Sequence, residues 1–98
     1  MSLPVVLRDE ARAEFNEAFD HYEDRRPGLG VHFVTRVQSV FDRIATNPRM
    51  HALVFADVRK AVVARFPYSV FNRSDAARVE ILAVFHGSRD PAICQARV

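Results

Sequence analysis

The chain has 98 residues, which is enough for one domain with a modest core. Its hydrophobic fraction of 49% excludes a disordered chain, and no apolar run approaches the ~20 residues that a membrane span requires. Met1 to Arg8 lack the long apolar region of a signal peptide, and Cys94, the only cysteine, excludes an internal disulfide. We therefore expect residues 1–98 to form a single cytoplasmic domain.

The net charge of +2 is unevenly distributed along the chain. Residues 1–48 carry six arginines against eight acidic residues, a balance of −2. Residues 49–98 carry seven arginines and Lys60 against four acidic residues, a balance of +4. Basic groups gathered in one half favour an anionic partner, either nucleic acid or an acidic peptide, although ordinary surface solubility accounts for them equally well.

The first half of the chain predicts a strand and two helices. Pro4 to Leu7 predicts a short strand, and Asp9 is placed to cap the helix that follows it. That helix carries an apolar stripe at offsets 0, 4, 7, 8 and 11 and ends at Pro27-Gly28. The stripe comprises Ala11, Phe15, Ala18, Phe19 and Tyr22.

The second helix is predicted from Leu29 to Thr46, before Asn47-Pro48. The same offsets recur in Phe33, Val37, Val40, Phe41 and Ile44. Two amphipathic helices joined by a short Pro-Gly turn form a helical hairpin, so another layer must cover their apolar stripes.

Three segments rich in Val, Ile, Phe and Tyr predict the strands of that layer: Val58 to Phe66, Tyr68 to Arg73 and Val79 to His86. Alternation along the first of them places Arg59 and Arg65 on one face. The last segment alternates poorly, which predicts a central strand covered on both faces. Residues Pro91 to Val98 predict no defined element.

The order is β-α-α-β-β-β, so the predicted fold class is α+β, with a helical hairpin packed on a small, mainly antiparallel sheet. The N-terminal strand is expected to pair with the C-terminal sheet, because an isolated strand would leave its backbone groups without partners.

From about Leu7 to about Pro91 the chain resembles the RelE/ParE toxin superfamily, and it resembles the ParE-like branch more closely. The order and spacing of several stretches carry this resemblance: Glu14-Phe15 through Tyr22-Glu23, Arg26 to Gly30 with Phe33, Ile44 with Asn47-Pro48, Asp57 to Lys60, Arg65 to Phe71, and Val84 to Pro91.

The resemblance implies the toxin of a type II toxin–antitoxin module, in a hetero-oligomer with a ParD-like antitoxin. ParE-like members poison DNA gyrase, whereas RelE-like members cut messenger RNA in the ribosomal A site. A non-toxic, antitoxin-binding module is a third alternative. The chain shows no DNA-reading motif, so contact with operator DNA is expected only through the antitoxin complex, and no membrane contact or cofactor is expected.

Metal-free RNA cleavage needs a base, cations that stabilise the phosphorane and an acid. The candidates for a ribonuclease are Arg59, Arg65 and His86. Lys60 is the only lysine, whereas RelE-like sites often use several, and Tyr68 stands where many of them carry arginine. The tail also lacks their late tyrosine, so binding is favoured over catalysis.

Candidates for binding the target or an anion are Arg59, Lys60, Arg65, Tyr68 and Arg89. Four of them also have a structural interpretation: Arg59 and Arg65 as a solvated edge, Tyr68 as a half-buried core residue, and Arg89 as part of a turn or local charge pair. The histidines lack metal-ligand spacing, so no metal site is expected. The acidic face of the first helix is either solvated or contacts a basic antitoxin segment.

Overall fold

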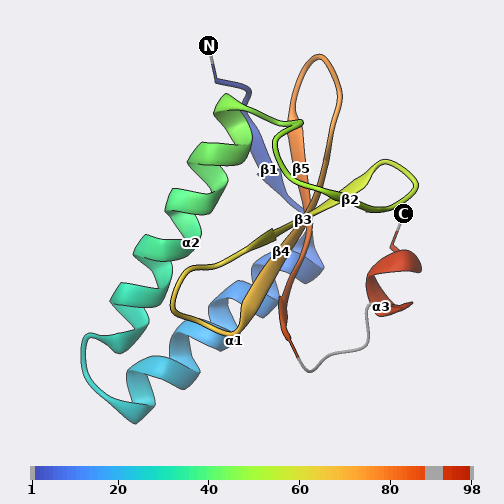
Figure 1. Ribbon diagram of the computed structural model, residues 1–98. Helices are drawn as coiled ribbons and strands as arrows, with labels where there is room; N and C mark the ends of the chain where they lie inside the picture. Colours follow the sequence, from blue (N-terminus) through green and yellow to red (C-terminus); the bar gives the residue numbers. More distant parts are fainter. Residues whose placement is uncertain (1, 88–91, 98) are drawn as a thin grey trace.

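The computed structural model describes residues 2–87 and 92–97 (Figure 1). The elements in chain order are β1 (Val5–Leu7), α1 (Asp9–Arg25), α2 (Leu29–Thr46), β2 (Leu53–Phe55), β3 (Val58–Val62), β4 (Tyr68–Ser74), β5 (Val79–His86) and α3 (Ala92–Gln95). Two helices pack on a five-stranded sheet, so the predicted α+β class and helical hairpin are confirmed.

The sheet has the strand order β1-β5-β4-β3-β2. β1 runs parallel to β5, with Val5 opposite Val79, and every other neighbouring pair is antiparallel. The expected pairing of the N-terminal strand with the C-terminal sheet is therefore confirmed. β2 was not predicted, because three residues are too few to show a periodicity.

The main core lies between the helical hairpin and one face of the sheet (Figure 1). All five residues of the predicted α2 stripe are buried, and Phe33 makes ring contacts with Phe15, Tyr22, Phe66 and Tyr68. A smaller cluster on the other face of the sheet comprises Val58, Phe71, Leu82, Ala83 and Phe85, with Phe55 packed against it.

α1 begins differently from the prediction. Arg8 is the N-cap residue and makes no side-chain cap hydrogen bond, so the prediction of Asp9 as the cap was wrong. The Arg8 N–H donates to the carbonyl oxygen of Ile81, which keeps Arg8 extended beside β5, and the helix starts at the next residue. Asp9 instead lies in the first turn, where its charge stabilises the positive end of the helix.

The hairpin turn brings the two helices into close contact. Gly28 has φ +89°, a left-handed conformation that favours glycine. A Cβ atom at Gly30 would lie 2.7 Å from the Phe19 carbonyl oxygen, so only glycine allows this approach. Glu23 accepts hydrogen bonds from the Gly28 and Val31 N–H groups at 3.3 and 3.2 Å. Its carboxylate thereby supplies acceptors for N–H groups at the start of α2 that have no partner within the helix.

β3 ends at Val62, four residues before the predicted end of the strand, so the prediction that Arg59 and Arg65 share one strand face was wrong. The chain turns away from the ladder because Arg65 takes φ +70°, and the Tyr68 N–H then bonds the Phe66 carbonyl oxygen at 2.8 Å. β5 was predicted with its observed bounds, and its poor alternation has a local cause: the register shifts at Phe71/Asn72, where Leu82 is the extra residue on β5.

Candidate functional site

An open groove of about 280 Å³ lies between α1 and the end of β5. Its lining residues are Glu14, Glu17, Ala18, His21, Tyr68, Val84 and His86. Tyr68 faces His86 across the β4–β5 ladder, and their rings meet edge to face with 5.3 Å between centroids. The structure therefore brings together, in the lining of this groove, two of the residues that the sequence singled out.

Tyr68 combines a structural contact with a polar group. Its ring packs at 5.0 Å from Phe33 and 6.1 Å from Tyr22, as measured between centroids, which fixes it against the core. Burial raises the pKa of Tyr68 above its ordinary value, and the neighbouring Tyr22 and Glu17 raise this pKa further. The phenol therefore keeps its proton at neutral pH and is available as a hydrogen-bond donor.

The described lining of the groove carries the wrong charge for phosphate. No arginine or lysine is among the described residues that line it. Glu14 is paired with Arg97, so among the described lining residues Glu17 supplies the carboxylate without an ion-pair partner. A ligand that carries positive charge suits this surface better than the backbone of RNA does.

Arg59 lies elsewhere in the sheet. It pairs with Asn72 on β4, four residues beyond Tyr68, and this places it roughly 13 Å along the strand from the groove. Its guanidinium donates to the His51 carbonyl oxygen at 2.6 Å and holds the loop before β2. Lys60, the next residue, is exposed and points to the opposite face of the sheet.

Arg65 lies in the connection between β3 and β4. Its left-handed backbone costs about 1 kcal/mol for a residue with a side chain. It lines a second pocket, with Arg26, Leu29, His32, Arg36 and Phe66. Arg26 and Arg36 were not among the candidate site residues from the sequence, where Arg26 appeared only in a stretch that carries the family resemblance. Arg89 lies outside the described residues.

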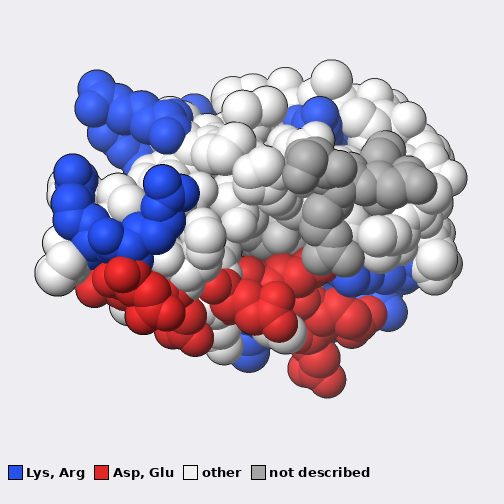
Figure 2. Space-filling view, turned by 90° about the horizontal axis from the view of Figure 1, so that it is seen from below, with Lys and Arg blue, Asp and Glu red and all other residues white. Residues whose placement is uncertain are grey.

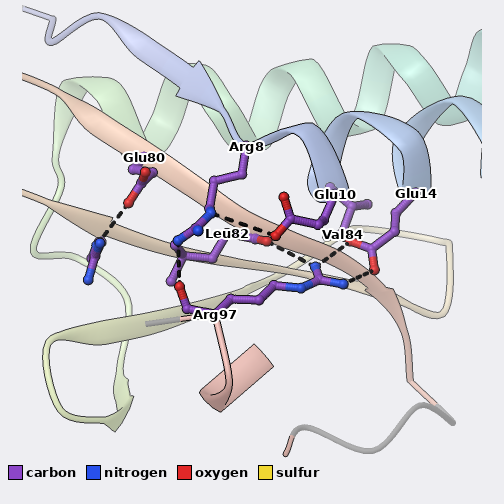
Figure 3. A network of polar contacts seen from close by, with 8 residues as sticks. Arg8, Glu10, Glu14, Glu80, Leu82, Val84 and Arg97 are labelled. Carbon is purple, nitrogen blue, oxygen red and sulfur yellow. Dashed lines mark hydrogen bonds and ion pairs between the residues drawn. The ribbon is translucent and has the colours of Figure 1, made fainter. Parts of the chain in front are cut away.

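An ion pair between Glu14 and Arg97 was not predicted from the sequence (Figure 3). Both guanidinium NH groups of Arg97 donate to the Glu14 carboxylate at 3.0 Å, in a two-pronged arrangement. Arg97 also donates to the Leu82 carbonyl oxygen at 3.1 Å, and its guanidinium lies 5.0 Å from the centre of the Phe85 ring. The main-chain oxygen of Arg97 accepts from Arg8.

This ion pair covers the edge of β5 that β1 leaves open. β1 pairs with β5 only as far as Ile81, so the next residues of β5 have no neighbouring strand on that side. Glu14 accepts from the Val84 N–H at 3.2 Å, and Arg97 occupies the Leu82 oxygen. Side chains thus satisfy backbone groups that an edge strand would otherwise expose.

The described residues carry further surface features away from the groove. Large apolar side chains are exposed at the far edge of the sheet, on Leu53, Val54 and Val62, with 68% of Val62 accessible. No group of three or more histidine, cysteine, aspartate or glutamate residues in the described part of the chain could hold a metal ion. Within those same ranges, no helix is both long and apolar enough to cross a membrane.

Comparison with known proteins identifies the family. Residues 5–91 match the model of the ParE toxin of the type II toxin–antitoxin system parDE. The chain belongs to the ParE toxin family.

A solved structure supports this ParE fold. A chain described as the chromosomal ParDE TA system from P. aeruginosa aligns with a TM-score of 0.75 at 18% sequence identity. The alignment covers 87% of the present chain and 96% of the other. No protein of curated function matches the sequence.

Proposed function

We propose that this ParE-family toxin arrests growth by binding DNA gyrase and that a cognate ParD-like antitoxin neutralises it in a cytoplasmic hetero-oligomer. Residues 1–98 would act as one toxin domain, without a cofactor. Family membership supplies gyrase as the target. The observation that favours binding over catalysis is the distance between Arg59 and the groove that holds His86.

Cleavage of RNA requires its base, acid and cations to meet at one phosphate, within hydrogen-bond reach of the reacting atoms. Here Arg59 is bonded to the loop before β2, Arg65 lines the pocket at the hairpin turn, and His86 lies at the end of β5. The described lining of the groove supplies no cation to stabilise a phosphorane. The three candidate catalytic residues lie in three different parts of the fold, which favours a protein that acts by binding.

The decisive experiment pairs two assays of the purified protein. We expect inhibition of gyrase supercoiling, or trapped DNA breaks, while an in vitro translation reaction runs unaffected. Induction of the chain in bacteria without its antitoxin should stop growth, and coexpression of the antitoxin should restore it. Untouched gyrase with blocked translation would overturn gyrase as the target, and unaffected growth would reduce the chain to a non-toxic, antitoxin-binding module.

A ribosome-dependent endoribonuclease is the second candidate, because one groove holds several groups able to transfer protons. Tyr68 and His86 meet there, with His21 and Glu17 in the same lining. This candidate requires the ribosome to supply the missing cations. Primer extension on transcripts from induced cells would then show new cuts in the A site, and His86→Gln would abolish them; intact transcripts would eliminate this function.

The antitoxin is proposed to cover apolar surface that the toxin leaves exposed at the sheet edge. Recognition of operator DNA is assigned to the antitoxin complex. A basic antitoxin segment along α1 would match the acidic residues of that helix, seven of which lie between Asp9 and Asp24.

A further inference from the structure

A pocket of about 300 Å³ at the hairpin turn gathers basic side chains from three separate segments. Arg26 follows α1, His32 and Arg36 lie on α2, and Arg65 comes from the connection between β3 and β4. His32 and Arg36 are one helical turn apart, so they share a face of α2. Leu29 and Phe66, both partly buried, provide the apolar part of the lining.

The three arginines of this pocket have no ion-pair partner among the described residues. No ion pair or side-chain hydrogen bond joins Arg26, Arg36 or Arg65 to any other described residue. The neighbouring Glu23 is already engaged by the first N–H groups of α2. Figure 2 shows a group of basic side chains at one end of the face, next to a band of acidic side chains. Like charges held together without a partner favour an anionic ligand.

The backbone of Arg65 adds a second, independent observation. Its φ of +70° lies in the region that residues with a side chain avoid, and no contact of its side chain within the described chain accounts for this conformation. Such conformations concentrate at binding sites, where the backbone aims a side chain. Here Arg65 lines the same pocket as the arginines of the helical hairpin.

We propose that this pocket binds a nucleotide phosphate, with the sugar or base packed on Phe66 and Leu29. Guanidinium groups match phosphate oxygens with paired N–H donors, and three of them suit a phosphate better than a single carboxylate. The Phe66 ring is held edge-on by Tyr22 at 5.0 Å and Phe33 at 5.3 Å, so it offers a rigid apolar surface for stacking.

A contact with phosphate does not read base sequence. The proposed pocket is therefore separate from the recognition of operator DNA, which is assigned to the antitoxin complex. It also differs from the groove at Tyr68 and His86, whose described lining carries no arginine or lysine. The bound phosphate would belong either to a free nucleotide or to a nucleic-acid strand. The inference does not depend on gyrase being the target, because direct binding is measured without gyrase.

Fluorescence anisotropy of the full chain with a short labelled single-stranded oligonucleotide tests the site. Arg36→Ala and Arg65→Gly should each weaken the affinity about tenfold and lower the slope of log K against log salt by about one. Arg43→Ala is the matched control, because Arg43 lies two turns further along the same face of α2 and outside the pocket. It should leave the affinity within about twofold. Glycine suits the backbone of Arg65, so that variant keeps the fold.

Two competitors identify the ligand. Displacement of the oligonucleotide by ATP at a similar concentration would assign the pocket to a free nucleotide, and failure of ATP to displace it would assign the pocket to a strand; both results support the proposal. Tighter binding of an acidic peptide than of either phosphate ligand would overturn it. So would an affinity that Arg36→Ala and Arg65→Gly reduce no more than Arg43→Ala does.

Discussion

Glu14 shows how a single residue joins distant parts of the chain. It lies on the apolar stripe of α1, between Ala11 and Ala18, and is buried with them. A carboxylate is seldom buried without a partner, and Arg97, 83 residues away, supplies that partner. Nothing local in the sequence marks the pair, because its two members are joined only by the folded topology. This part of the structure was therefore beyond prediction from helical periodicity.

We predict that Arg97→Ala lowers the free energy of unfolding by about 3 kcal/mol, because it leaves the Glu14 carboxylate buried without its cation. Urea unfolding of the purified chain would measure the change. Arg12→Ala, on the exposed face of the same helix, should change stability by less than about 0.5 kcal/mol. Equal effects of the two substitutions would show that the ion pair contributes nothing.

The free energy of unfolding should depend on pH through His51. Burial lowers the pKa of His51 below its ordinary value of 6.5, and the positive charges of Arg43 and Arg59 lower it further. The folded chain therefore binds fewer protons at this site than the unfolded chain in the window below 6.5. Above pH 6.5, neutral His51 makes its full contribution to the free energy of unfolding. This contribution is lost as the pH falls toward the pKa of His51 in the folded chain.

The measurement is urea unfolding of the chain and of His51→Gln at several pH values from about 7.5 down to about 5. The free energy of unfolding should fall less steeply with decreasing pH in the variant than in the parent chain. Parallel curves would show that His51 does not titrate differently in the folded and unfolded states.

At the scale of elements, the helices were predictable and the sheet only partly so. The stripe of α2 defines a helix by itself, because its apolar residues recur with the helical period over four turns. β3 was predicted too long because Val63, Ala64 and Phe66 continue the apolar composition of a strand past Val62, whereas the left-handed backbone of Arg65 turns the chain away from the ladder. β5 was located correctly, but its bulge at Leu82 is visible only in the pairing with β4.

The strained backbone of Arg65 should make its replacement by glycine stabilising. Arg65→Gly should raise the free energy of unfolding by about 1 kcal/mol, because glycine adopts φ +70° without the steric penalty of a Cβ atom. Ala64→Gly, at the preceding position, should instead lower it by about 0.5 to 1 kcal/mol, since flexibility is gained only in the unfolded chain. Denaturant unfolding of the two variants would show whether the free energy of unfolding rises in Arg65→Gly and falls in Ala64→Gly. Destabilisation by both substitutions would mean that the Arg65 side chain contributes more than its backbone costs.

The whole molecule presents surfaces of different chemistry. The helical hairpin covers one face of the sheet, and the groove beside α1 carries Glu17 and two histidines. The pocket at the hairpin turn carries three arginines, and the far edge of the sheet is apolar. The sequence showed that acidic and basic residues concentrate in different halves of the chain. It could not show that Arg26 and Arg36, from the acidic half, join Arg65 in one pocket, because that depends on how the hairpin meets the turn after β3.

The exposed apolar edge has a consequence for assembly with the antitoxin. Val62 is 68% accessible, and burial of a valine side chain contributes roughly 1.5 kcal/mol or more. Val62→Ser should therefore leave the stability of the free chain nearly unchanged but weaken antitoxin binding about tenfold, as titration calorimetry would measure. Val31→Ser is the matched control, because Val31 is 58% accessible but lies on α2, away from the sheet edge. If Val62→Ser and Val31→Ser weaken the complex equally, the antitoxin does not recognise this edge, and its contact must be sought along the acidic face of α1.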